Sequence, residues 1–165
     1  MLFKRKDKEP DDFDFYFKVA GVTFDNDDGV NRQVILKSIA NDIREQINPE
    51  YLYDGLRNKD IKADRLEHVY ELEAWDDIPV DVLEGCFNDE VAYEVRYEND
   101  LIGFMPRDKI EDFQALLKKF KNCTTEARLI GGKTKSFDYD TEKVVLDTLD
   151  YGMVVRCKFS GRYNR

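Results

Sequence analysis

The chain has 165 residues, of which 42% are hydrophobic, and its 35 acidic and 26 basic side chains give a net charge of −9. This length and composition are typical of a single folded domain with its own core. No apolar run approaches the roughly 20 residues of a membrane-spanning helix, and the N-terminus lacks the apolar segment of a secretory signal. We therefore expect a cytoplasmic protein with no membrane partner.

The charge is unevenly distributed along the chain. Residues 1–100 contain 13 Lys and Arg against 26 Asp and Glu, whereas residues 101–165 contain 13 against 9. The acidic total opposes non-specific binding to phosphate backbones, because that binding depends on cationic side chains. The second part of the chain can still supply a local basic face, and an ordinary charged surface in water is the alternative.

Cysteine and histidine are scarce. The cysteines are Cys86, Cys123 and Cys157, and His68 is the single histidine. Their number and spacing argue against a disulfide framework and against a Cys-x-x-Cys metal site. Clustered carboxylates such as Asp76-Asp77 leave a divalent-metal enzyme open as a weaker alternative. We expect no catalytic residues, no bound metal and no cofactor.

The N-terminal third of the chain predicts a tail, a strand and two helices. Residues 1–12 are charged and are expected to form a mobile tail. Alternation at 13–24 predicts a strand with Phe15, Phe17 and Val19 on one side. Apolar residues recur every three to four positions over 31–46, which predicts a helix capped by Asn31. A second helix is expected to start at Asn48-Pro49.

The middle of the chain predicts further strands. Residues 67–75 alternate and favour a strand, whereas 76–87, with Pro79 and Gly85, are expected to be irregular. Residues 90–97 and 100–105 predict a hairpin that turns at Glu98-Asn99. Pro106 ends its second strand because proline has no backbone N–H to donate.

The clearest helix is predicted at 107–121, where acidic residues open and lysines close an amphipathic pattern. A strand at 124–130 is expected to end at Gly131-Gly132, residues 137–149 favour either a hairpin arm or a short helix, and 151–159 predict a final strand. The expected class is α+β: a small, mostly antiparallel β-barrel of the OB or SH3 type with two or three packed helices, formed as one domain by residues 13–165.

Several segments together match a known family pattern. They are A-G-V-T-F at 20–24, Y-E-L-E at 70–73, N-D-E-V-A-Y-E-V at 88–95 and I-G-F-M-P-R-D at 102–108, with Gly131-Gly132 further on. In this order they resemble the HIRAN domain, and I-G-F-M-P-R-D is the most specific part. The resemblance spans residues 15–159, with 46–66 and 76–85 as insertions.

The resemblance implies a role in DNA processing. HIRAN domains grip the free 3′ end of single-stranded DNA in a small barrel. By resemblance, Phe24 stacks on a base and Asp89 accepts a hydrogen bond from the terminal hydroxyl. Asn88 stands where the family has a tyrosine and Thr23 where it has a basic residue. Loss of that tyrosine removes about 1–3 kcal/mol of stacking per base.

The remaining candidates are cationic. Arg107 opens a predicted helix, where side chain and free amides can meet a phosphate. Arg156 and Lys158 are two positions apart on a predicted strand and therefore share a face. Structural alternatives are a packed aromatic for Phe24, a turn residue for Asp89 and a solvated sheet face for these cations.

These observations favour a non-enzymatic module that binds nucleic acid, with single-stranded DNA or its 3′ end as the partner. The alternative is a protein-interaction module whose acidic surface binds a protein partner, or mimics DNA.

Overall fold

A computed structural model of the protein describes residues 11–72 and 77–163. The elements in chain order are β1 (Asp12–Lys18), α1 (Arg32–Gln46), the 3₁₀ segment η1 (Pro49–Gly55), α2 (Asn58–Asp64), β2 (Val69–Tyr70), β3 (Ile78–Pro79), β4 (Asp81–Phe87), β5 (Glu90–Tyr97), β6 (Asp100–Phe104), α3 (Arg107–Lys119), β7 (Phe120–Asp138) and β8 (Lys143–Arg162).

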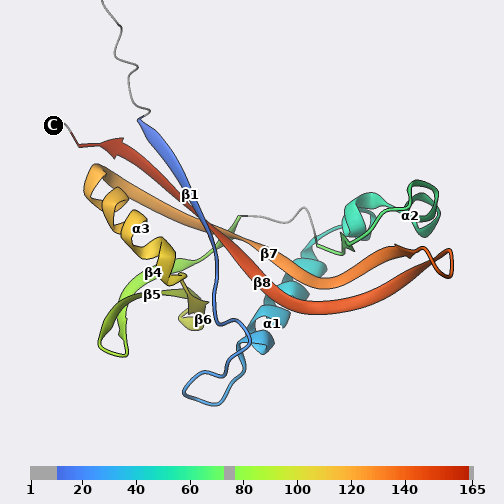
Figure 1. The fold of residues 1–165 in the computed structure, drawn as a ribbon, viewed down its shortest axis with the longest axis horizontal. Helices are drawn as coiled ribbons and strands as arrows, with labels where there is room; N and C mark the ends of the chain where they lie inside the picture. Colours follow the sequence, from blue (N-terminus) through green and yellow to red (C-terminus); the bar gives the residue numbers. More distant parts are fainter. Residues whose placement is uncertain (1–10, 73–76, 164–165) are drawn as a thin grey trace, which may run out of the picture.

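The long hairpin of β7 and β8 is the central element of the fold. Figure 1 shows it running the length of the molecule, with α3 and β4–β6 near one end and α2 near the other. β1 pairs with β8 from Asp12 opposite Ser160 to Lys18 opposite Val154, and β2 and β3 pair with β7. Every pairing in this five-stranded sheet is antiparallel.

β1 confirms the expected alternation. Phe15, Phe17 and Val19 are buried, whereas Tyr16 is exposed. The strand is shorter than expected, because it ends at Lys18 and the chain then continues as a loop. It also begins at Asp12, one residue inside the expected tail, and residues 1–10 of that tail lie outside the described residues.

The second sheet has the order β4-β5-β6. The predicted 90–105 hairpin is confirmed, with Glu98 and Asn99 at positive φ in its turn. The expectation of irregular structure over 76–87 is wrong, because 81–87 forms β4, which pairs with β5 from Glu90 to Arg96. Pro79 occupies the short β3, where proline is tolerated, and Gly85 lies within β4 opposite Ala92.

The two glycines at 131–132 do not end a strand but lie opposite a bulge in β8, where Asp150 and Tyr151 both stand across from Gly131. Both glycines have positive φ, and a Cβ on Gly131 would lie 2.1 Å from the carbonyl oxygen of Asp150. The register shifts here, and β7 continues to Asp138. The expected strand end was therefore wrong, and of the two alternatives for 137–149 the structure has the hairpin arm.

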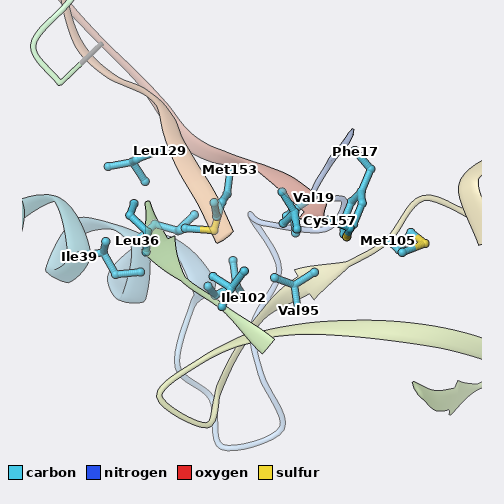
Figure 2. Close-up of a cluster of buried hydrophobic side chains, with 14 of the residues drawn as sticks. Phe17, Val19, Leu36, Ile39, Val95, Ile102, Met105, Leu129, Met153 and Cys157 are labelled. Carbon is cyan, nitrogen blue, oxygen red and sulfur yellow. The ribbon is translucent and has the colours of Figure 1, made fainter. Parts of the chain in front are cut away.

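The helices pack as their patterns predicted. Asn31 caps α1 by accepting a hydrogen bond from the Gln33 N–H, and the buried side of the helix includes Leu36, Ile39 and Ile43. The ring of Phe113 in α3 lies 4.9 Å from that of Tyr93, centroid to centroid. Figure 2 shows side chains of α1, β1 and both sheets gathered in one core.

The segment between α1 and β3 differs from its prediction. Asn48-Pro49 does start a helical segment, but it is a 3₁₀ segment with left-handed residues Tyr53 and Asp54, and α2 follows it. The expected strand over 67–75 is reduced to Val69–Tyr70. Residues 73–75 of that expectation lie outside the described residues.

The α+β class with mostly antiparallel strands is confirmed. Within residues 11–72 and 77–163 the strands form two sheets and no closed barrel is recorded, so the barrel stays a prediction. In the same ranges no helix is long and apolar enough to cross a membrane.

Candidate functional site

A cleft of about 510 Å³ opens between the loop after β1 and the three-stranded sheet. Its walls come from the loop after β1, the start of α1, the β4–β5 hairpin and the junction of β6 with α3. The lining is largely apolar and includes Phe24, Phe87, Val91, Phe104 and Ile110. This volume lies within the range of about 300–1,000 Å³ that is usual for small-molecule sites.

A single bridge between the sheets forms the floor of the cleft. The Ala20 N–H donates to the Phe104 carbonyl at 2.8 Å, and the Phe104 N–H donates to the Ala20 carbonyl at 2.9 Å. Gly103 permits this approach, because a Cβ there would lie 2.3 Å from the Ala20 oxygen. The I-G-F-M-P-R-D segment therefore joins the sheets and places Phe104 and Arg107 at the cleft.

Two phenylalanine rings in the cleft are open to solvent. Phe24 is 66% exposed and Phe87 is 51% exposed. The Phe87 ring lies 5.7 Å from that of Phe104, centroid to centroid. Phe24 is thus not a core aromatic, and its ring is free to stack on a flat ligand.

Arg32 is the residue of the candidate site that sequence reasoning missed. It is only 7% exposed, although it lines the cleft. Its Nε donates to Asn26 Oδ1 and its Nη1 to the Gly21 carbonyl, both at 2.8 Å. Its Cζ lies 5.3 Å from the centre of the Phe104 ring. Burial lowers the pKa of this guanidinium, against the opposing charges of Asp27 and Glu94.

A signal for Arg32 was present in the sequence. It precedes Leu36 by four residues and therefore falls on the apolar stripe of α1, where a charge is unexpected.

Arg107, a candidate because it opens the predicted helix, is among the residues that line the cleft. It is the first residue of α3 and its side chain is largely exposed. Its Nη1 lies 3.6 Å from Glu90 Oε2, so a ligand phosphate must compete with that carboxylate. Pro106 before it contributes no N–H, which weakens the helix start as an anion site.

Asn88 and Asp89 form the tip of the β4–β5 hairpin. Both have positive φ, and Phe87 pairs with Glu90 across them. A two-residue hairpin turn with positive φ at both positions favours Asn and Asp for local reasons. Their exposed side chains lie beside the wall made by Phe87 and Glu90 but are not among the residues lining the cleft.

Thr23 is also at the margin. It is exposed, and its carbonyl accepts a hydrogen bond from the Asn31 side chain at 2.9 Å. This hydrogen bond helps to fix the loop that carries Phe24, but Thr23 itself does not line the cleft.

Arg156 and Lys158 share a face of β8, as predicted, but neither lines the cleft. Arg156 Nη2 bonds Asp14 at 2.7 Å, and Lys158 Nζ lies 2.9 Å from Glu126 Oε1. The hydrogen bond from Lys158 lowers the pKa of Glu126, and the bond to Asp14 raises the pKa of Arg156. These cations stabilise a sheet face, and the structure does not bring them to Phe24.

The cleft mouth carries both signs of charge. Its lining includes Arg32 and Arg107 together with the acidic residues Asp25, Asp27 and Glu90. A neighbouring hollow of about 420 Å³ adds Asp28, Glu94 and Asp100. Within the described ranges, no group of three or more His, Cys, Asp or Glu side chains could hold a metal ion.

Comparisons with protein-family models, with curated proteins and with solved structures find no match for this chain. The function has to be inferred from the cleft itself.

Proposed function

We propose that this protein binds single-stranded nucleic acid, with a strand end in the cleft between the loop after β1 and the three-stranded sheet. The observation that carries the proposal is the pair of solvent-exposed rings, Phe24 and Phe87, that line one largely apolar cleft. Exposed aromatic rings in a concave apolar site are the platforms on which unpaired bases stack.

Arg32 gives this platform a fixed position. Its two hydrogen bonds to the loop at Gly21 and Asn26 hold the segment that carries Phe24. Because Gly21 has a φ of +76° and a Cβ there would lie 3.0 Å from Arg32 Nη1, the loop conformation depends on this glycine. A pre-formed platform loses less conformational entropy when a base binds.

Arg107 and Asp89 would meet the backbone of the strand. Arg107 is the exposed cation at the start of α3, in reach of a phosphate beside the stacked base. Asp89, at the hairpin tip next to Phe87, would accept a hydrogen bond from a terminal 3′ hydroxyl. Since Arg156 and Lys158 are paired elsewhere, few phosphates are neutralised, and the proposed site holds one or two nucleotides at an end.

The barrel and the compartment belong to this proposal. The resemblance to HIRAN domains implies a curled barrel, which the bridge between Ala20 and Phe104 would close at one corner. The cytoplasm fits the free state of Cys86, Cys123 and Cys157, since reducing compartments keep thiols unpaired.

The second candidate is a protein-interaction module. The carboxylates of Asp25, Asp27 and Glu90 around an apolar cleft suit a basic peptide that inserts a hydrophobic side chain. This candidate and the first predict opposite effects of removing Glu90, which separates them.

Fluorescence anisotropy tests the leading proposal. Single strands labelled at the 5′ end and carrying either a 3′ hydroxyl or a 3′ phosphate are titrated with the protein, alongside a blunt duplex. We expect the strand with a 3′ hydroxyl to bind best. Phe24→Ala should weaken its binding by about 1–3 kcal/mol, roughly 5- to 150-fold.

Tyr51→Ala is the matched control, because Tyr51 is equally exposed but lies in η1, outside the cleft. Asp89→Ala should remove the preference for the 3′ hydroxyl while leaving most of the affinity, because it removes the acceptor. The proposal is wrong if the protein binds no single strand, or if Phe24→Ala and Tyr51→Ala bind equally well.

A further inference from the structure

The edge of β8 that faces away from β7 has different hydrogen-bond partners along its length. β1 pairs with it from Ser160 to Val154. The side chain of Gln33 then accepts from the Tyr151 N–H at 2.8 Å and donates to the Tyr151 carbonyl at 2.7 Å. Further along, the Thr148 N–H donates to the side chain of its neighbour Asp147 at 2.8 Å.

The next backbone groups on this edge have no such cover. On β7, the Phe137 N–H donates to the Leu66 carbonyl, and the Lys133 carbonyl accepts from the Glu71 N–H. The backbone N–H and C=O groups of these two β7 residues therefore point away from β8. Val144 and Thr148 are their partners on β8. Because these are non-hydrogen-bonded pairs of an antiparallel ladder, the backbone N–H and C=O groups of Val144 and Thr148 point away from β7, toward the open edge.

Leu146 lies midway between Val144 and Thr148 and points to the same edge. Val144 and Leu146 therefore present N–H and C=O groups with no partner strand among the described residues.

The side chains around this open edge are apolar and exposed. Leu146 is 70% exposed and Val145 is 40% exposed. Figure 1 shows this arm of the hairpin projecting away from α3 and the three-stranded sheet. An open edge with exposed apolar side chains is a template for pairing with another strand.

We propose that this edge, residues 143–147 of β8, pairs in antiparallel fashion with the same edge of a second copy of the chain. The two β7–β8 hairpins then form one continuous sheet across a two-fold axis. This inference goes beyond the proposed nucleic-acid binding and does not depend on it, since the cleft lies on other elements and stays open in the pair.

Charge complementarity selects the register. When Val145 lies opposite its own copy, Lys143 of each chain lies opposite Asp147 of the other. These are non-hydrogen-bonded positions, where side chains come closest. Val144 and Leu146 then form the hydrogen-bonded pairs, with each N–H donating to the other residue's carbonyl.

Neighbouring registers are less favourable. Centring the pair on Asp147 places two carboxylates opposite each other, and centring it on Leu146 places Asp147 opposite Val145. The Asp147 side chain keeps one oxygen for the Thr148 N–H and has a second for Lys143 of the partner.

The pairing is short, and specific protein interfaces usually bury about 1,200–2,000 Å². We therefore expect a weak dimer, with a dissociation constant on the order of 100 µM.

Sedimentation velocity over two decades of concentration tests the proposal with the full chain. The unchanged protein should shift from monomer to dimer. Lys143→Asp alone and Asp147→Lys alone should each remain monomeric, because each places like charges opposite one another. An equimolar mixture of the two variants should form a heterodimer, since every facing pair is then opposite in charge.

Two further variants complete the test. Leu146→Pro removes an outward N–H that β7 does not use and should abolish the dimer while leaving the fold intact by circular dichroism. Lys59→Asp makes the same charge change on exposed α2 and should dimerise normally. The proposal is overturned if the unchanged protein stays monomeric throughout, or if the two charge variants self-associate as well as it does.

Discussion

Ala20 and Phe104 exchange both of their backbone hydrogen bonds, and this bridge joins the five-stranded sheet to the three-stranded one. It lies directly under the candidate cleft, so stability and site geometry share one structural element. The close approach depends on Gly103, whose absent Cβ leaves room for the Ala20 carbonyl.

Gly103→Ala should destabilise the protein by about 1–3 kcal/mol or more, because the added methyl overlaps backbone that cannot move without breaking the bridge. Gly85→Ala is the control: it also lies in a strand of this sheet, but its Cβ would make only ordinary contacts of 3.6 Å with Glu94. Urea denaturation measures both. Equal stability of the two variants would show that the bridge is not a tight contact.

Arg32→Leu should cost about 1.5–3 kcal/mol, because the Gly21 carbonyl and the Asn26 side chain would lose charged hydrogen bonds in a buried place. Arg32→Lys should recover only part of this, since an ammonium cannot reproduce the fork of the guanidinium. Lys37→Leu, on the exposed side of α1, is the matched control for charge. Thermal unfolding of the three variants would contradict this if Arg32→Leu matched the control.

Glu90→Gln should strengthen binding of single-stranded DNA, because it releases Arg107 from its ion pair and removes a carboxylate from the cleft mouth. The gain should shrink at high salt, where such exposed charges are screened. The same variant should weaken binding of a basic peptide. Anisotropy at low and high salt measures the change, and weaker DNA binding by Glu90→Gln would favour the protein-interaction candidate.

The ion pairs of Glu126 predict an acid dependence. The hydrogen bond from Lys158 holds the pKa of Glu126 below its usual range in the folded protein. Its contribution to stability is therefore complete above the unfolded-state pKa of about 4.3 and is lost as the pH falls through the folded-state value.

Stability curves should accordingly show a constant difference between the unchanged protein and Glu126→Gln above about pH 5, and a shrinking difference below it. A difference that grew on acidification would contradict the assigned role of this carboxylate.

Local patterns predicted the elements whose partners are close in sequence. Periodicity predicted the apolar stripe of α1 and the helix after Pro106. Capping and turn chemistry predicted the cap at Asn31 and the hairpin that turns at Glu98-Asn99. The local pattern left Phe24 open between a packed aromatic and an exposed ring, and its exposure in the structure excludes the packed alternative.

Strand pairing explains most of the differences. Gly85 favoured irregular structure at 81–87, but pairing with β5 across the two-residue turn at Asn88-Asp89 makes this segment a strand. Gly131 and Gly132 predicted a strand end, whereas they make room for a bulge of β8 at Asp150 and Tyr151, and β7 continues beside β8. The separation of Arg156 from the cleft depends on which face of β8 pairs with Asp14, and nothing local specifies that.

The most direct test of the central claim is an NMR titration of the ¹⁵N-labelled protein with a short single-stranded oligodeoxynucleotide. Saturable shifts should be concentrated at Gly21, Phe24, Phe87 and Arg107, with little change along the β7–β8 arm. An absence of saturable shifts, or shifts centred on the β8 face of Arg156 and Lys158, would contradict the assignment of the cleft as the binding site.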